Sequence, residues 1–220
     1  MMPNDNATRA QMAAMLVRVF GCTAGKDIAF FSDVNRDAWY YPELSTAVQM
    51  NILSGYGDGT IGPNRSITRQ EAMVVIARAF AVPDGTAADI QAFRDASSVG
   101  SWAVAKVGGL VKAGIVNGDN GSLHPTASIT RAEIAQMLYN LGLQFCSDAA
   151  ALPASGRVIY TGAAPLTADT FTGTLYLGGP AGRDLGGMNI TGTLVVRTDP
   201  NGTVTVGGTV DTLAVAAEDT

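Results

Sequence analysis

The chain has 220 residues, enough for one large domain or two modest ones, and its composition excludes several classes of protein. Hydrophobic residues make up 47% of the chain and charged residues only 15%, a balance that argues against intrinsic disorder. The 14 Lys and Arg against 19 Asp and Glu make the chain mildly acidic, so a broad basic face for nucleic acid is not expected. No apolar run approaches the roughly 20 residues that cross a bilayer, so no membrane span is predicted.

The polar start, MMPNDNATRA, contains no signal peptide, and the first copy of a repeated motif begins part-way through its unit. We therefore expect the sequence to belong to a longer protein, and the missing signal says little about its compartment. Cys22 and Cys146 are too few to indicate a disulfide framework, so whether they are bonded stays open.

Two long segments of the chain repeat one another. Residues 31–80 and 93–141 share, in the same order, a Phe, an Asp, a Trp, an Ile-x-x-Gly, a Pro and a Thr-Arg pair. Residues 6–21 match only the last third of this unit, so the chain holds two complete repeats and the tail of another. We assign residues 1–22 to the C-terminal part of repeat 1, 28–82 to repeat 2 and 90–145 to repeat 3.

Each complete repeat predicts two short helices. The first follows the Trp, and a glycine-rich turn, SGYGDGT or NGDNGS, ends it; the second starts at the Thr-Arg motif. Such helices are too short to be stable alone, so the repeats must pack on each other. In the first helix of repeats 2 and 3, the apolar positions with helical spacing are Leu44, Val48 and Ile52, and Val107, Leu110 and Val111. In the helices that start at the three Thr-Arg motifs, they are Met12, Leu16 and Val19; Ala72, Val75, Ile76 and Phe80; and Ile134, Met137, Leu138 and Leu141.

The character of the chain changes after residue 148. The sequence ALPASG predicts a linker at residues 149–156, and short β-branched runs separated by Gly, Asn and Asp turns fill residues 157–220. FTGTLYL at residues 171–177 recurs as ITGTLVV at residues 190–196, a period that predicts an incomplete β-solenoid, with a small β-sandwich as the alternative. A final rung with an unpaired edge would also fit a longer chain. The predicted fold class is α+β in two parts, mainly helical repeats followed by an all-β region.

A Thr-Arg motif occurs three times, as ATRAQ at residues 7–11, ITRQE at residues 67–71 and ITRAE at residues 129–133. Thr with Glu or Gln three residues later, before an apolar run, is a capping box. Its hydroxyl accepts from the N–H three residues on, and the Glu or Gln side chain accepts from the N–H of the Thr. The box explains the Thr and the Glu or Gln, but not the arginine between them.

Arg9, Arg69 and Arg131 occupy the first helical position, where a cation is slightly unfavourable. We interpret them as one anion site in each repeat. A helix N-terminus with a guanidinium beside it offers several backbone donors and a bidentate fork to a carboxylate or phosphate. The alternative is an internal ion pair, for example to Asp33 or Asp95.

One repeat contains, in order, Phe-Ser-Asp-Val, Trp, Ile-x-x-Gly-Tyr-x-Asp-Gly-Thr, Pro-Asn and Ile-Thr-Arg-x-Glu. This series of motifs resembles the S-layer homology (SLH) repeat, and the resemblance covers residues 6–142. In that family three repeats form a pseudo-three-fold helix bundle with prongs, and grooves between the prongs bind an acidic, pyruvylated secondary cell-wall polysaccharide. The resemblance therefore implies non-catalytic anchoring at the extracellular surface of a Gram-positive-type bacterium, in its cell wall or S-layer. The polysaccharide is the implied partner, and self-association in a surface array stays open.

The resemblance implies that Arg9, Arg69 and Arg131 contact the acidic sugar. The first repeat lacks its Trp-led helix and turn, and the third has a shorter turn without the tyrosine, so we expect unequal grooves. Further candidate ligand-binding residues are Ser54, Gly55, Tyr56, Asn117 and Gly118 in the glycine turns, and Trp39 and Trp102, which are either sugar platforms or core anchors.

No catalytic residue, cofactor or metal site is predicted. The glycine turns lack the spacing of an EF-hand, His124 is the only histidine, and the acids of the β region fall at turns. Two alternatives to glycan anchoring stay open. One is a structural or adhesin stalk that binds no glycan in this part of the chain, and the other is the anchor of a polysaccharide-active enzyme whose catalytic domain is absent from it.

Overall fold

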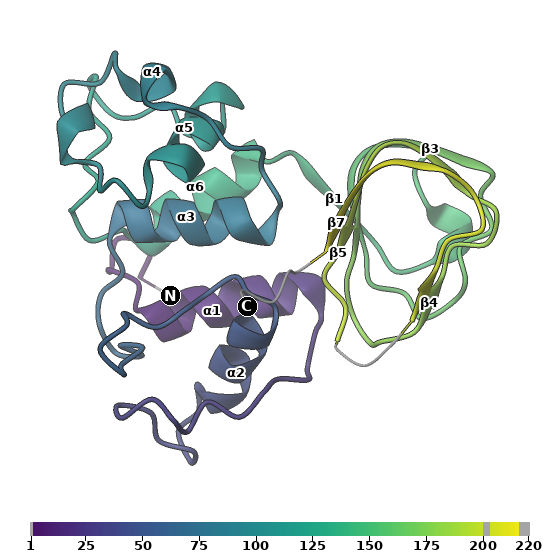
Figure 1. Ribbon diagram of the computed structural model, residues 1–220, viewed down its shortest axis with the longest axis horizontal. Coiled ribbons are helices and arrows are strands. Elements are labelled where there is room, and N and C mark those ends of the chain that lie inside the picture. Colours follow the sequence, from purple (N-terminus) through teal and green to yellow (C-terminus); the bar gives the residue numbers. More distant parts are fainter. Residues whose placement is uncertain (1, 200–202, 216–220) are drawn as a thin grey trace. The chain divides into compact units, whose positions relative to one another are not determined.

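The computed structural model describes residues 2–199 and 203–215 (Figure 1). The chain divides into two compact units, each built from two stretches of sequence. Unit 1 comprises Met1–Met12 and Ile61–Leu141, and unit 2 comprises Ala13–Thr60 and Gly142–Thr220. The units do not follow the repeats, because the first half of repeat 2 belongs to the same unit as the β-rich region.

Unit 1 is helical. It contains α3 (Arg69–Ala79), α4 (Ala87–Ile90), α5 (Val104–Lys112), α6 (Arg131–Asn140), a 3₁₀ turn (Ala96–Ser98) and the start of α1 (Arg9–Phe20). Helix α5 packs against both α3 and α4. Two glycines of α5 allow this approach, because a Cβ on Gly109 would overlap the carbonyl oxygen of Pro83, and one on Gly108 would lie 2.7 Å from that of Thr86.

Unit 2 contains the rest of α1 and the Trp-led helix of repeat 2, α2 (Tyr41–Gln49), which has a proline in its first turn. After α2, Asn51 adopts a φ of 54°, a left-handed conformation that asparagine tolerates well, and the chain turns there. Ile52 lies beyond the helix end and is nevertheless fully buried.

The apolar positions predicted from helical spacing form the cores of the two units. Most are buried, and only Val19, Val111 and Leu138 are half-buried. The periodicity of the sequence therefore identified the inward faces of these helices correctly.

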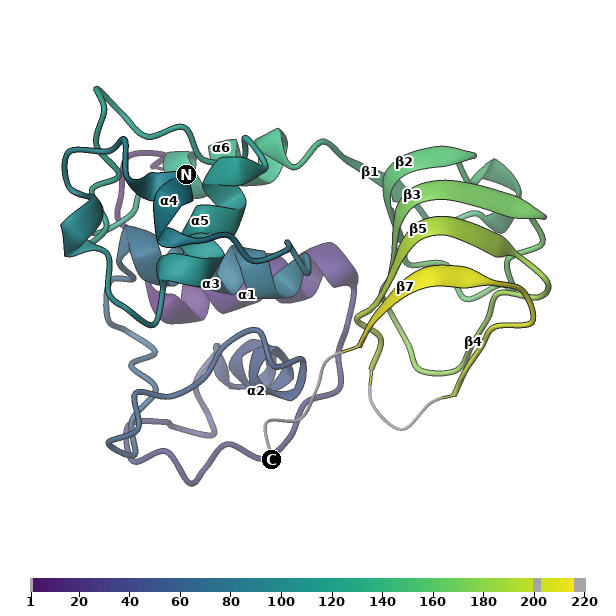
Figure 2. The same ribbon diagram turned by 45° about the horizontal axis from the view of Figure 1, so that its top comes forward.

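The β-rich region is a parallel β-solenoid, as the repeated FTGTLYL pattern predicted. Its main sheet has the order β1-β2-β3-β5-β7, and each neighbouring pair is parallel, so the strands stack as successive rungs (Figure 2). The strands are β1 (Leu143–Cys146), β2 (Ser155–Tyr160), β3 (Thr170–Leu177), β5 (Asn189–Val196) and β7 (Val210–Val215), and a second sheet pairs β4 (Arg183–Asp184) with β6 (Val204–Thr205). The all-parallel main sheet excludes the β-sandwich alternative, whose strands would be antiparallel.

A column of glycines explains the Thr-Gly-Thr pattern of the rungs. Gly156, Gly173 and Gly192 are partners in register, with φ values of 118°, 121° and 130°. A Cβ at Gly173 would overlap the carbonyl oxygen of Gly156, and one at Gly192 would overlap that of Gly173. Both the backbone conformation and the close approach of neighbouring rungs therefore require glycine at these positions.

The solenoid sheet starts earlier than the sequence suggested. Strand β1 begins inside the segment that we assigned to repeat 3, and β2 begins at Ser155, inside the expected linker. Leu143–Cys146 carries little strand signal of its own, and its parallel pairing with β2 supplies the hydrogen bonds that make it a strand. Residues 200–202 and 216–220 of the expected β region lie outside the described residues.

Cys22 and Cys146 are both free and buried. Among the residues that the structure describes, no helix has the length and apolar character that a membrane span requires.

Candidate functional site

Each Thr-Arg motif starts a helix with a capping box, as predicted. The Thr68 hydroxyl accepts from the N–H of Glu71, and the carboxylate of Glu71 accepts from the N–H of Thr68 at 2.8 Å. The same two bonds join Thr130 to Glu133 before α6, and Thr8 to Gln11 before α1.

The three motifs meet in a closed ring of backbone hydrogen bonds. The N–H of Ala7 donates to the carbonyl of Ile129 at 2.9 Å, that of Ile129 donates to Ile67 at 3.0 Å, and that of Ile67 donates to Ala7 at 2.9 Å. Each of these residues comes directly before the threonine of its motif. The ring therefore repeats one contact three times and puts the three motifs in equivalent positions of unit 1.

The backbone donors expected at the anion sites are already used, so that part of the prediction is wrong. The N–H of Arg69 donates to the carbonyl of Ala127, and that of Gln70 donates to Pro125, both at 2.9 Å. The helix starts at Arg9 and Arg131 have the equivalent bonds, to residues 65 and 63 and to residues 5 and 3. Ring closure brings the next repeat across each helix end, and its carbonyls occupy the donors that a ligand would need.

The arginine side chains reach toward the glutamates of the next repeat. Arg9 donates through Nε to the carbonyl of Ile61 at 2.7 Å, and its Nη1 lies 3.3 Å from the carboxylate of Glu71. Arg69 repeats this arrangement, with Leu123 at 2.9 Å and Glu133 at 2.6 Å. The internal ion pair that we kept as an alternative therefore exists in these two repeats, with glutamate as the partner instead of Asp33 or Asp95.

The third arginine differs from the other two. The ring would pair Arg131 with residue 11, which is Gln11 instead of a glutamate. Arg131 lies 3.8 Å from Asp5 instead, and its side chain is 28% exposed, against 5% for Arg9 and 10% for Arg69. The environments of the three arginines are thus unequal, and the expected inequality of the grooves stays a prediction.

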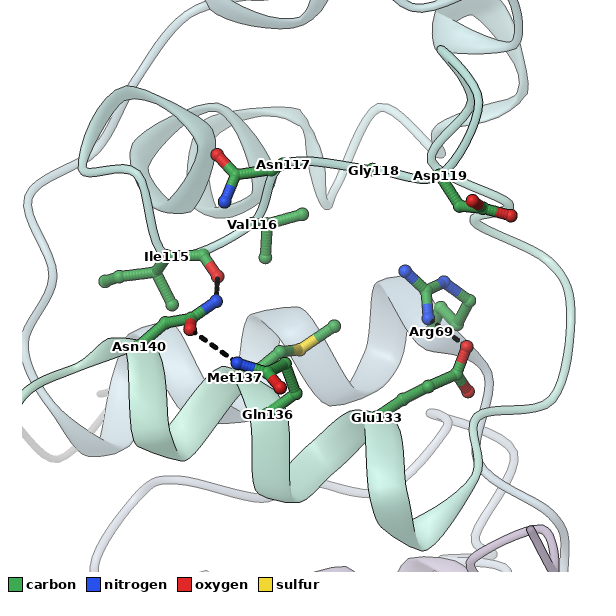
Figure 3. A pocket seen from close by; sticks show the side chains of 10 residues that line it. All are labelled: Arg69, Ile115, Val116, Asn117, Gly118, Asp119, Glu133, Gln136, Met137 and Asn140. Atoms are coloured by element: carbon green, nitrogen blue, oxygen red, sulfur yellow. Dashed lines mark hydrogen bonds and ion pairs between the residues drawn. The ribbon is translucent and has the colours of Figure 1, made fainter.

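A pocket of about 420 Å³ lies beside Arg69 in unit 1 (Figure 3). One wall is the segment at residues 115–119, which leads into the glycine turn, and the other is the face of α6 that carries Glu133, Gln136, Met137 and Asn140. The guanidinium of Arg69 points into the space between these walls. Its Nη2 makes no hydrogen bond or ion pair within the described parts of the chain, although the side chain is nine-tenths buried.

The far end of the pocket is lined by side-chain amides. Gln136 donates to Asn140 at 2.8 Å, and Asn140 donates to the carbonyl of Ile115 at 2.9 Å, as the dashed lines of Figure 3 mark. Val116 from one wall and Met137 from the other add apolar surface between this end and Arg69. The pocket thus offers a cation, amide groups and an apolar surface, the combination that small-molecule sites use.

Of the sequence-predicted residues, the structure brings Arg69, Asn117 and Gly118 together at this pocket. Sequence reasoning missed the residues of α6 that face them. A signal was present, because Gln136 and Asn140 are polar residues four positions apart, on one face beside the apolar stripe of that helix.

The two glycine turns are built alike. At Gly118, with φ of 70°, a Cβ would lie 2.6 Å from the ring of Phe93, and at Gly55 a Cβ would overlap the ring of Phe31. Beside Gly55, Ser54 is exposed and Tyr56 is half-buried. Gly55 and its two neighbours belong to unit 2, and their role in binding stays a prediction.

Asp95 fixes the far side of the third repeat's turn. Its carboxylate accepts from the N–H groups of Leu123 at 2.8 Å and His124 at 2.7 Å. Burial by itself raises the pKa of Asp95, but these hydrogen bonds outweigh it and hold the pKa below its usual value. The aspartate therefore orders the segment whose Leu123 carbonyl orients Arg69.

The two tryptophans are not core anchors. Trp39 is 58% exposed in unit 2, where its ring meets that of Tyr40 edge-on, and Trp102 is 57% exposed in unit 1. The edge of the Trp102 ring lies against Gly100. Their exposure leaves both available as sugar platforms, and that role stays a prediction.

Comparison with known families identifies the class of protein. Residues 30–73 and 92–135 match the family model of the S-layer homology domain, so the chain contains two S-layer homology repeats. It carries two recognised copies of a domain that anchors proteins at the cell surface without catalysis, and its relatives include S-layer proteins.

The relatives combine this domain with different partners. The chain is 34% identical over 143 residues to an amylopullulanase of Thermoanaerobacterium thermosulfurigenes, and 33% identical over 138 residues to a surface-layer 125 kDa protein of Lysinibacillus sphaericus. It is 30% identical over 145 residues to a cellulosome-anchoring protein of Acetivibrio thermocellus. These matches cover 63%, 60% and 62% of the chain but only 8%, 11% and 32% of the three relatives.

Proposed function

We propose that this chain anchors a surface protein non-covalently to the cell wall by binding an acidic wall polysaccharide, with the pocket at Arg69 as its main site. The observation that supports this proposal is the position of the Arg69 guanidinium. Its Nη2 points into the pocket from a side chain that is nine-tenths buried. A charged donor held in place away from bulk water binds a carboxylate more strongly than a mobile surface arginine does.

The neighbours of Arg69 prepare it for a ligand. Leu123 and Glu133 hold two of its three nitrogens at 2.9 and 2.6 Å, so the guanidinium is oriented before a ligand arrives. Little side-chain entropy is then lost on binding. A pyruvate ketal on a terminal sugar presents a planar carboxylate that suits the remaining nitrogen, and the amides at the far end suit sugar hydroxyls.

The pocket is not a general anion trap. Glu133 and Asp119 both line it, so its side chains bring two carboxylates against one guanidinium. A highly charged anion would be repelled, whereas a ligand with a single carboxylate among many hydroxyls fits. This balance favours an acidic sugar over a phosphate-rich polymer.

The test compares binding to isolated wall sacculi before and after removal of the wall polysaccharide, and after mild acid release of ketal-linked pyruvate. The proposal expects pull-down that requires the polysaccharide and falls when pyruvate is removed. Arg69→Ala should weaken binding about tenfold or more, the value of a charge-assisted hydrogen bond.

Two further variants protect the test against misfolding of Arg69→Ala. Asn117→Ala and Gln136→Ala change exposed pocket residues and should each weaken binding several-fold with the helical content unchanged. Arg36→Ala, a change at an exposed ion pair of unit 2, should bind like the unchanged chain. Equal binding by all variants would refute the site, and binding that ignores pyruvate would refute the acidic sugar.

The same experiment tests two alternative functions, which the names of the relatives suggest. A stalk that binds no glycan predicts no difference between intact and stripped sacculi. An enzyme predicts release of soluble sugar during the incubation, which a reducing-sugar assay would detect.

A further inference from the structure

In unit 2 the end of α1 meets the β-solenoid. Alternation along the rungs directs Leu175 and Leu177 into the solenoid core, so Tyr176 between them faces outward. In register with it are Ile159 on β2 and Val195 on β5, and all three are at most 3% exposed. An outward-facing apolar column is therefore covered.

The last residue of α1 packs against Tyr176 of this column. The ring of Phe20 lies 6.4 Å from that of Tyr176, centroid to centroid, and Phe20 itself is fully buried. Its carbonyl accepts from the N–H of Gly179 at 2.6 Å. A Cβ at Gly178 would overlap that carbonyl oxygen, so a glycine is needed where the helix end meets the rung.

The residues after α1 continue the contact along the solenoid. The thiol of Cys22 donates to the carbonyl of Arg197 at 2.6 Å. The carboxylate of Asp199 accepts from the N–H groups of Thr23 and Ala24, both at 2.8 Å, and from the Thr23 hydroxyl at 3.2 Å. Successive partners come from the corners that follow β3 and β5, so residues 20–24 span more than one rung.

We propose that residues 20–24, with Gly179, Arg197 and Asp199, form a clasp that joins the solenoid to α1 as one mechanical unit. The solenoid is then not attached only through the chain segment that leads from α6 into β1. A pull on the β region enters α1, the helix that starts with the first Thr-Arg motif, as well as that segment. The clasp also covers the apolar column, which would otherwise be an exposed hydrophobic patch.

The test measures amide hydrogen exchange in the full chain. Thr23 and Ala24 should be protected, and Asp199→Ala should speed their exchange about tenfold or more, because a charge-assisted acceptor is lost. Asp184→Ala is the matched control, since Asp184 accepts a turn N–H in the same solenoid and makes no bond to residues 20–24. Asp199→Asn, which keeps the size and one acceptor, should lie between the two and serves if the alanine variant fails to fold.

A second readout separates a mechanical junction from a local turn. Phe20→Leu alters α1 alone, yet it should speed exchange in β3 and β5 several-fold, because opening at the helix end uncovers Tyr176. Exchange in β3 and β5 that ignores this change would overturn the junction. Unprotected Thr23 and Ala24 amides in the unchanged chain would overturn the clasp itself.

Discussion

The ring of unit 1 and the solenoid of unit 2 are both made of sequence repeats, but different forces join the repeats. In the ring, backbone hydrogen bonds join all three motifs, and Arg9 and Arg69 each add a side-chain contact to the glutamate of the next motif, so this added joint depends on which residue stands there. In the solenoid, identical positions stack in register and the backbone itself makes the contact. Side-chain joints tolerate variation between repeats, as at Arg131, whereas the close backbone approach requires glycine at the same position of three successive strands, β2, β3 and β5.

The largest effect is expected from Glu71→Ala in the ring. Glu71 caps α3 and faces Arg9, and their side chains are only 14% and 5% exposed. Removing the acid takes away the carboxylate that the buried Arg9 guanidinium contacts, which should cost about 4 kcal/mol of unfolding free energy. Urea denaturation followed by circular dichroism measures it.

Glu71→Gln is the matched control for this change. The amide keeps an oxygen for the Thr68 N–H and loses only the charge, as Gln11 does in the first motif. It should cost clearly less than Glu71→Ala. Equal costs would mean that the charge of the ion pair, and not the cap, carries the joint.

The second effect tests the backbone joint. Gly192→Ala places a Cβ onto the carbonyl oxygen of Gly173 at a φ of 130°, so the rung must distort, and we expect a loss of about 3 kcal/mol. Gly187→Ala is the control, because a Cβ there meets no atom within 4 Å. A loss at Gly192 no larger than at Gly187 would contradict the in-register column.

The two kinds of joint were not equally readable in the sequence. The periodicity of the sequence is a local signal, and it predicted the helices, their inward faces and the solenoid rungs. The capping boxes follow from residues three positions apart. The parallel pairing of Phe171 with Ile190 was likewise written in two similar strings.

The contacts between motifs could not be read in the same way. No residue near Arg69 in the sequence indicates that its side chain will contact Leu123 and Glu133, or that its N–H will donate to the carbonyl of Ala127. Those partners arrive only when the ring closes. The helix-end donors therefore looked available, and the division into two compact units was hidden.

A smaller effect tests the clasp through pH. Burial raises the pKa of the Cys22 thiol to about 11 from a usual 9.0. The folded chain thus keeps a proton that the unfolded chain loses, so stability is full below pH 9 and falls as pH rises toward 11. Between pH 9 and about pH 10 the loss should be about 1 kcal/mol.

Cys22→Ala isolates this contribution. The variant should be less stable at every pH, but the difference from the unchanged chain should shrink by about 1 kcal/mol between pH 9 and about pH 10. Urea unfolding at both pH values measures it. A difference that stays constant would show that the thiol is not buried in solution.

The smallest effect tests whether Arg131 can also form an ion pair with the next motif, as Arg9 and Arg69 do. Arg131 lies 3.8 Å from an exposed Asp5, a pair worth a few tenths of a kcal/mol, so Arg131→Ala alone should change stability by less than about 0.5 kcal/mol. Gln11→Glu places an acid where the first two arginines find theirs in the next motif. A double-mutant cycle between the two positions should then give a favourable coupling of about 0.5 to 1 kcal/mol, which is absent with Gln11. Zero coupling would mean that the three motifs are equivalent in their backbone only, and that the side-chain joints of Arg9 and Arg69 depend on more than the acid opposite them.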